Sequence, residues 1–294
     1  LKNMDDMIAG ARVEVAPYKE FSGDFVLWKP SSKDQPGWDS PSGYGRPGWH
    51  IECSAMSKSY LGEQFDIHGG GIDLIFPHHE NENAQSCCAN NTPFMANFWM
   101  HNGHLTVDGT KMSKSLGNFL TVKDLRLKWH PEVIRFALLS SHYRQPLDFS
   151  DDLLHQSKQA LDRFYQALLD FKDIKPEPFE LVENALRDDL NTPLAIYHLH
   201  QAVLELNKTK DPKIAFMIRG GGGDLGILNM NPDDWFKQSL SSSLSEEEIL
   251  RCIEQRTKAR SQKDFKTSDD IRDYLKQHGV IIDDSKLGTT WKYI

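Results

Sequence analysis

The chain has 294 residues, 39% of them hydrophobic and 10% aromatic, which is enough for two or three domains with buried cores. No apolar run is long enough to cross a bilayer and no signal-peptide pattern opens the sequence, so we expect a cytoplasmic protein that does not contact a membrane. The net charge of −8 argues against a nucleic-acid-binding face over the whole protein, because phosphate contacts need basic residues. The chain begins at Leu1 with no helix start signal, which predicts a cut through a longer protein.

The cysteines do not indicate a disulfide framework. Cys87 and Cys88 are adjacent, Cys53 and Cys252 lie far from them, and a chain of this size does not depend on disulfides for stability. We therefore expect reduced thiols or a metal site.

Residues 1–120 alternate short apolar runs with glycine, proline and aspartate. The runs at 25–28, 65–68 and 97–101 predict buried strands, and residues 77–90 have helical composition. A strand, a helix and a strand in this order are typical of a parallel α/β sheet, whose ligands gather at the carboxyl ends of the strands. The three glycines at 69–71 are expected to form a loop after the second strand.

From residue 121 onward, apolar residues recur at helical spacing, and we expect a small helix bundle. Pro131 and Pro193 are placed to open helices, because proline is favoured in a first helical turn. The four glycines at 220–223 are expected to interrupt the bundle, and the serine-rich stretch at 239–243 to link it to the next unit.

The segment from residue 244 to the end has the pattern of a separate α/β unit. Ser245 and Glu248 predict a capping box at the start of a helix, and a second helix is expected at 268–277. Two strands are predicted at 280–282 and 289–293. Five basic residues and one acidic residue at 256–266 give that stretch a charge of +4, which suits either an RNA backbone or an ordinary solvated helix face.

The strongest candidate for a metal site consists of Cys53, His78 and Glu82. The last two are four residues apart, which places both on one face of a helix, and a thiolate, an imidazole and a carboxylate together suit zinc. Three protein ligands and an open position are typical of catalytic zinc. Composition alone favours the plainer alternative of a buried cysteine and a solvated helix face, because no regular motif joins Cys53 to His78.

Two further segments carry residues suited to a nucleotide. Lys111 and Lys114 belong to the string Lys-Met-Ser-Lys-Ser, where ammonium groups can stabilise charge on a departing pyrophosphate; an ordinary basic loop is the alternative. Gly70 and Asp73 follow a predicted strand, where glycine lets the backbone approach a nucleotide and aspartate can hold ribose hydroxyls. A tight turn is the plainer explanation of that second segment.

Taken together, these segments resemble the cysteinyl-tRNA synthetases, a family of class I aminoacyl-tRNA synthetases. The resemblance extends over essentially the whole chain and is carried by residues 24–29, 45–56, 65–71, 76–82, 111–115, 188–193 and 288–291. Residues 111–115 match the signature loop of class I synthetases without a change.

The resemblance implies a zinc site that selects the amino acid. Cys53, His78 and Glu82 would bind one zinc ion per chain, with a fourth ligand, a cysteine, upstream of the first residue. Trp49 and His68 would line the pocket for L-cysteine. Cysteine and serine differ only in sulfur against oxygen, so the preference of zinc for a thiolate would supply selectivity that an apolar pocket cannot.

The resemblance also implies an enzyme that uses ATP with Mg²⁺ as a substrate. Lys111 and Lys114 would be catalytic, and Lys114, Gly70 and Asp73 would bind ATP. The reaction would activate L-cysteine to cysteinyl-adenylate and transfer cysteine to tRNA(Cys), and we expect a monomer.

The implied fold class is α/β with three parts. Residues 1–120 would be the C-terminal part of a Rossmann-type class I catalytic domain, with the zinc site and the signature loop. Residues 121–238 would form a stem-contact region and a helical bundle that braces the tRNA. Residues 244–294 would be a small α/β domain that recognises the anticodon.

One motif of the family, the His-Ile-Gly-His string that stabilises the ATP phosphates, is not in this sequence. We therefore predict no adenylate formation by this chain alone unless another segment supplies that motif. Two alternatives remain open: a related ligase that joins cysteine to an amino-sugar, as in mycothiol synthesis, and a non-catalytic zinc- or RNA-binding module. The basic C-terminal unit argues against the first alternative, and the intact catalytic motifs argue against the second.

Overall fold

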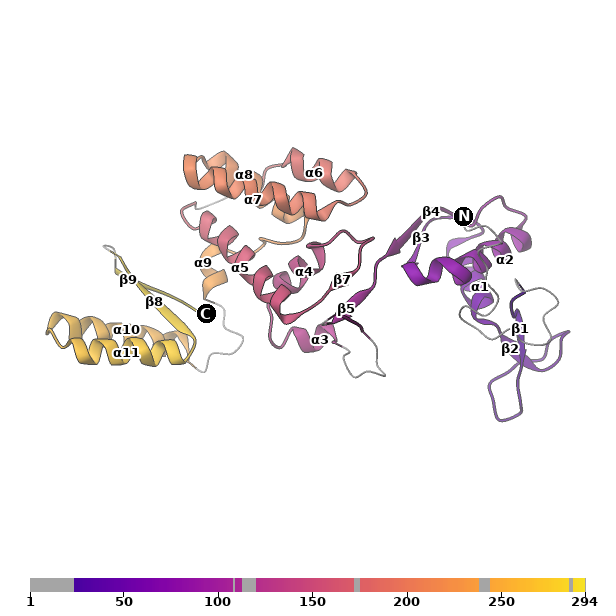
Figure 1. The fold of residues 1–294 in the computed structure, drawn as a ribbon, viewed down its shortest axis with the longest axis horizontal. Coiled ribbons are helices and arrows are strands. Elements are labelled where there is room, and N and C mark those ends of the chain that lie inside the picture. The colour runs from indigo at the N-terminus through magenta and orange to yellow at the C-terminus, as the bar shows by residue number, and fades with distance from the viewer. Residues whose placement is uncertain are drawn as a thin grey trace. The chain divides into compact units, whose positions relative to one another are not determined.

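A computed structural model describes residues 24–107, 109–112, 120–171, 175–237, 244–285 and 288–293. The chain divides into two compact units, Leu1–Gly103 and His104–Ile294 (Figure 1). None of the helices in the described part of the chain combines the length and the apolar character needed to cross a bilayer.

The first unit contains two parallel strands joined by a helical crossover. β3 (Phe65–Gly71) pairs in parallel with β4 (Ala96–Asn102), which confirms the predicted order of strand, helix and strand. Between them in the sequence lie η2 (Ile72–Leu74), η3 (Ile75–His79) and α2 (Glu80–Asn90). The loop expected at 69–71 is wrong, because these glycines belong to β3 and pair with residues of β4.

Helix α1 (Trp49–Leu61) packs against α2, and a short antiparallel pair of strands precedes it. These strands are β1 (Trp28–Pro30) and β2 (Gly45–Pro47). The strand predicted at 25–28 is therefore misplaced, since pairing begins only at its last residue. The ring of Phe25 instead packs edge-on against the ring of His50, with the ring centroids 5.4 Å apart.

The interior of the first unit is unusually polar. Among the described residues up to 103, the buried hydrophobic side chains are Met95 and Ala96. The buried polar side chains in the same range are His50, Ser54, His78, His79, Glu82 and Ser86. Burying polar groups costs free energy unless they find partners, so this unit is not organised around an apolar core alone.

The second unit begins with a three-stranded sheet and a bundle of helices (Figure 1). The sheet has the order β6-β5-β7. Its strands are β5 (Leu105–Val107), β6 (Thr110–Lys111) and β7 (Leu147–Asp148). The helices are α3 (Val122–Leu125), α4 (Pro131–Leu139), α5 (Asp151–Leu168), α6 (Glu180–Arg187), α7 (Thr192–Thr209), α8 (Pro212–Asp224) and α9 (Pro232–Phe236). Pro131 and Pro193 lie in the first turns of α4 and α7, as predicted.

A buried carboxylate ties the bundle together. Glu132 in α4 accepts hydrogen bonds from the hydroxyl of Tyr165 at 2.8 Å and from the backbone amides of Leu228 and Asn229 at 2.9 and 3.0 Å. Burial and the neighbouring carboxylate raise the pKa of the Tyr165 hydroxyl, which keeps it a donor. Helices α4 and α5 are thus joined to the segment after α8.

The four glycines at 220–223 lie inside helix α8, so the expectation that they interrupt the bundle is wrong. Close packing explains why glycine is there. A Cβ atom on Gly220 would lie 1.8 Å from the carbonyl oxygen of Glu177, and one on Gly222 would lie 2.7 Å from Cδ1 of Leu228. A Cβ atom on Gly223 would meet nothing within 4 Å.

Substitution by alanine should therefore change the free energy of unfolding in opposite directions at Gly223 and Gly220. Gly223→Ala should raise the free energy of unfolding by about 0.5–1 kcal/mol, because alanine is the better helix former and has room. Gly220→Ala should lower it by about 1–3 kcal/mol through overpacking. Urea unfolding of both variants measures the effect, and shifts of the same sign would contradict this account of the packing.

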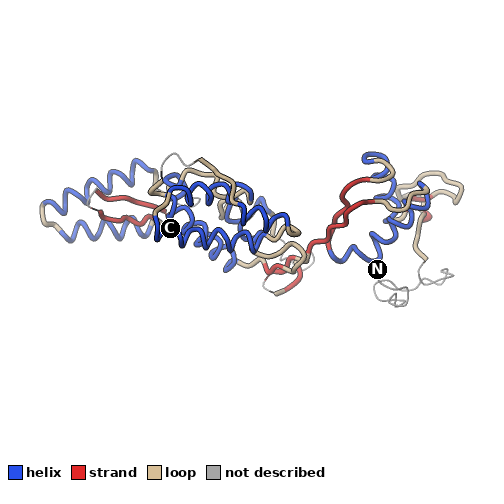
Figure 2. The backbone as a smooth tube through the Cα atoms, turned by 90° about the horizontal axis from the view of Figure 1, so that it is seen from above, coloured by secondary structure: helices blue, strands red, loops and turns tan. Residues whose placement is uncertain are grey.

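The C-terminal part has a hydrophobic cluster of its own, formed by Leu244, Ile249, Leu275 and Val280. Helices α10 (Glu246–Ser261) and α11 (Phe265–Gln277) lie side by side and pack on the hairpin of β8 (Val280–Ser285) and β9 (Gly288–Tyr293) (Figure 2). The capping box of Ser245 and Glu248 is present, as predicted.

The basic stretch at 256–266, which runs from α10 into α11, is less available to an RNA backbone than its charge of +4 suggests. Arg256 is buried and donates two hydrogen bonds, of 2.9 and 2.7 Å, to the carboxylate of Asp284. Arg260 contacts the same carboxylate. Lys258, Lys263 and Lys266 stay exposed. Two of the five cations of this stretch therefore hold the hairpin against the helix.

Asp284 should make the stability of this part depend on pH. Hydrogen bonds from Arg256 and Thr289 hold the pKa of its carboxyl well below the usual range. Asp284→Asn should lower the free energy of unfolding at pH 7 by about 1 kcal/mol, a modest value because water screens a partly exposed pair.

This difference should persist above about pH 4, near the pKa of an unfolded aspartate, and shrink as the pH falls toward the lower folded pKa. Hydrogen exchange in β8 and β9 across a pH series measures it. An equal difference at pH 7 and at pH 2 would show that the carboxylate charge is not responsible.

Candidate metal centre

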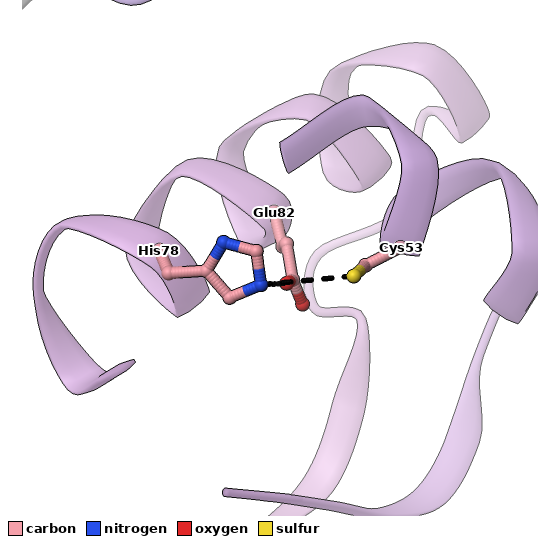
Figure 3. Close-up of side chains that lie close together, drawn as sticks. All are labelled: Cys53, His78 and Glu82. Carbon is pink, nitrogen blue, oxygen red and sulfur yellow. Dashed lines mark hydrogen bonds and ion pairs between the residues drawn. The ribbon is translucent and has the colours of Figure 1, made fainter. Parts of the chain in front are cut away.

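Three side chains predicted as metal ligands meet between α1 and α2. Cys53 comes from α1, His78 from η3 and Glu82 from the first turn of α2 (Figure 3). The Sγ atom of Cys53 lies 3.6 Å from Nε2 of His78, and that nitrogen also contacts Oε1 of Glu82. The three ligand atoms all lie within 4.8 Å of one another, so a single cation could touch each of them.

The carboxylate of Glu82 is the most constrained group of the site. Its side chain is completely buried, with an exposed fraction of 0%. Within the described chain, neither of its oxygens accepts a hydrogen bond of normal geometry, although Nε2 of His68 lies 2.9 Å from Oε2. Burial alone would raise the pKa of this carboxyl, but the imidazoles of His68 and His78 outweigh it and hold the pKa below its usual value. A buried anion with unfilled acceptor positions is suited to a cation.

The thiol of Cys53 completes the donor set. Burial, with the nearby charge of Glu82, raises the pKa of this thiol to about 11. Without a cation it therefore stays protonated near neutral pH. A thiolate sulfur, an imidazole nitrogen and a carboxylate oxygen fit Zn²⁺, and three protein ligands leave a position open.

Sequence reasoning missed a layer of histidines behind these ligands. Nδ1 of His50 lies 2.9 Å from Nδ1 of His78, and Nδ1 of His79 lies 2.8 Å from Nε2 of His101. Burial lowers the pKa of His79 to about 4, so it is neutral at physiological pH. His50 stands three residues before Cys53, and that helical spacing is a signal that could have revealed it.

Trp49 and His68, predicted to line an amino-acid pocket, both lie against the metal ligands. The indole of Trp49 stacks on the ring of His78 with centroids 4.2 Å apart, yet 59% of the residue is exposed. His68 lies against Glu82, as described above. Trp49 is thus an exposed ring stacked on one candidate ligand, and its pocket role, like that of His68, stays a prediction.

The structure describes only some of the residues predicted to bind a nucleotide. Gly70 lies in β3, where a Cβ atom would approach the ring of His79 to 2.9 Å, so glycine is required by packing. Asp73 follows in η2. Lys114 and the side chain of Lys111 lie outside the described residues, while the backbone of Lys111 belongs to β6. The ATP roles of these residues stay predictions.

Thiol reactivity should report the buried state of Cys53. In metal-free protein at pH 7.5, iodoacetamide should modify the exposed Cys88 first and Cys53 much more slowly, because a thiol with a pKa of about 11 is almost entirely protonated. Mass spectrometry of the two peptides over time measures both rates in one sample. Equal rates would mean that Cys53 is neither buried nor influenced by Glu82.

Two family models match this chain. The model described as tRNA synthetases class I (C) catalytic domain matches residues 1–159, and the DALR domain matches residues 181–227. With the α/β first unit and the helical part that follows, these matches confirm the predicted fold class.

Sequence relatives carry one common name. The chain is 54% identical to a cysteine–tRNA ligase from Paramagnetospirillum magneticum, 53% to one from Rhodospirillum centenum and 51% to one from Saccharophagus degradans. Each alignment covers 99% of this chain and 65% of the relative. The chain thus spans just under two thirds of the length of these relatives.

Among solved structures, a ternary complex of LeuRS from Agrobacterium radiobacter K84 with tRNA and LeuAMS aligns with a TM-score of 0.47 at 14% identity. This alignment covers 68% of this chain and 31% of that one. A likeness of this degree says nothing about the chemistry of the present chain.

Proposed function

Because the chain belongs to the class I (C) tRNA synthetases, we propose that it is part of an enzyme that joins L-cysteine to tRNA(Cys). The reaction would use ATP with Mg²⁺ to form cysteinyl-adenylate and then transfer the cysteine to the tRNA. All four cysteines are free thiols, as is usual in a reducing compartment, and we place the reaction in the cytoplasm with the protein as a monomer.

The observation that carries this proposal is the convergence of Cys53, His78 and Glu82 around a buried, unsatisfied carboxylate. These residues would hold one zinc ion, which would supply a soft Lewis acid that favours a thiolate over a hydroxyl. Glu82 stays anionic through its neighbours, so it would hold the cation without giving up a proton. The His78 ring, covered by Trp49, is kept from rotating out of the site.

The amino acid would be held beside this centre. Trp49 offers an exposed indole face over His78, which suits the apolar CH₂ group of cysteine. Nε2 of His68 lies 2.9 Å from Oε2 of Glu82 and would help to orient that carboxylate. Discrimination against serine would rest on sulfur chemistry, because shape alone separates two such similar side chains poorly.

The remaining assignments rest on the family resemblance. Lys111 and Lys114 would stabilise the ATP phosphates as pyrophosphate leaves, and Gly70 and Asp73 would contact ATP. Residues 1–120 would form the catalytic part, residues 121–238 would brace the tRNA, and residues 244–294 would read the anticodon. Lys258 in α10, Lys263 after it and Lys266 in α11 are exposed cations that could contact RNA phosphates.

Zinc content tests the metal site directly. Protein purified without chelator should contain about one zinc ion per chain by elemental analysis. Cys53→Ser and His78→Ala should each remove most of it, because each takes away one ligand. Saturating zinc should also raise the melting temperature of wild type, since a ligand of the folded state alone stabilises it.

Cys88→Ser is the matched control, since this thiol is exposed and stands apart from the three ligands. It should keep the zinc content of wild type. Zinc that is absent from wild type, or retained equally in Cys53→Ser and His78→Ala, would refute the proposed site.

Activity separates the rival functions. Cysteine-dependent exchange of pyrophosphate into ATP should require this chain together with a segment that carries the His-Ile-Gly-His motif. Cysteinylation of tRNA(Cys) would exclude a ligase for amino-sugars, and transfer to an amino-sugar instead would establish one. No exchange with that segment present, despite a loaded metal site, would leave a non-catalytic module.

A further inference from the structure

We propose that His50 is a positioning residue for the metal ligand His78: its ring accepts the Nδ1 proton of His78 and so keeps the Nε2 lone pair directed at Cys53 and Glu82. This inference rests on the proposed metal site. It assigns a role to a residue that lies outside the three ligands and outside the predicted pocket.

The two nitrogens of the His78 ring must have different roles if the residue binds a cation. A neutral imidazole carries a proton on one nitrogen and a lone pair on the other. Figure 3 shows one ring nitrogen of His78 facing Cys53 and Glu82, while the other nitrogen lies away from both. A cation among the three ligands needs the lone pair on Nε2, so the proton must be on Nδ1 and needs an acceptor.

His50 supplies that acceptor. Its Nδ1 lies 2.9 Å from Nδ1 of His78, which is a normal hydrogen-bond length. Two ring nitrogens can share only one proton, so the bond from His78 fixes the other tautomer too: His50 must carry its proton on Nε2. The pair therefore has one arrangement that leaves Nε2 of His78 open to a cation.

The surroundings of His50 hold it in place. It lies in the first turn of α1 with an exposed fraction of 8%, one helical turn before Cys53. The ring of Phe25 packs against it at a near-perpendicular angle of 89°. Because the same helix carries His50 and Cys53, α1 positions one ligand directly and orients a second ligand through its partner.

A purely structural role for His50 makes a different prediction, and two substitutions separate the two roles. The amide of asparagine reaches the position of Nδ1 of histidine, so His50→Asn can still accept the proton from His78. The amide of glutamine reaches the position of Nε2, so His50→Gln loses that contact while keeping a polar side chain of similar volume.

The experiment measures zinc affinity by competition with a chromophoric chelator, and the visible spectrum of the Co²⁺ form as a second readout. His50→Gln should weaken zinc binding by about 10–100-fold, the range seen when the partner of a metal-bound histidine is lost. His50→Asn should bind zinc close to wild type and keep its Co²⁺ spectrum. Neither readout depends on catalysis.

Ser54→Ala is the matched control from the same helix. Ser54 is buried, and its one hydroxyl proton has two acceptors in reach, the backbone oxygen of Glu82 at 3.3 Å and Oε1 of Gln85 at 3.1 Å, but not His78. Its loss should lower metal-free stability with little change in zinc affinity. Thermal unfolding of each metal-free variant records the purely structural cost.

Each result has a definite meaning. Zinc binding by His50→Gln as tight as by wild type would overturn the inference and leave the metal site standing. Equal weakening in His50→Asn and His50→Gln, with equal loss of metal-free stability, would overturn it in favour of packing. No zinc in wild type would refute the proposed site, and this inference with it.

Discussion

The first unit is organised around a charge that has no ordinary place in a protein interior. Glu82 is wholly buried, its oxygens lack proper hydrogen bonds within the described chain, and imidazoles rather than lysine or arginine surround it. The neighbouring elements fit this constraint: α1 brings a thiol to the same point, and Gly70 leaves room for the ring of His79. The polar interior thus centres on the three candidate ligands and not on an apolar core.

Sequence reasoning named the three candidate ligands that the structure brings together, and it missed the histidines that lie beside them. Glu82 follows His78 by four positions, a spacing that predicts both on one helix face, and the two side chains are in contact. Cys53 joins them only because α1 packs on α2, which no local pattern records. The place of His50 could have been predicted from the sequence, since it stands one helical turn before Cys53. The place of His101 could not, because only the register of β3 and β4 brings it beside Gly70.

Helix starts agreed with the local sequence pattern, whereas several other features depended on tertiary contacts that the local pattern does not show. The capping box of α10 and the prolines of α4 and α7 set helix starts as predicted. The glycines of α8 lie inside a helix despite their poor propensity, and Glu177 and Leu228 leave no room for a side chain at Gly220 and Gly222. Arg256 carries a charge that composition assigns to the surface, yet Asp284 holds it inside. Neither packing nor partner could be known from the residue itself.

The polar interior of the first unit also sets how that unit responds to temperature. The heat-capacity increase on unfolding comes mainly from hydrating apolar surface, and hydrating polar surface reduces it. The bundle buries many leucine, isoleucine and phenylalanine side chains, whereas the described part of the first unit fully buries the hydrophobic side chains of Met95 and Ala96 alone. Per residue, the described part of the first unit should therefore contribute a smaller heat-capacity increase on unfolding than the bundle. Cooling should therefore reduce the hydrophobic stabilisation of this part less than it reduces that of the bundle.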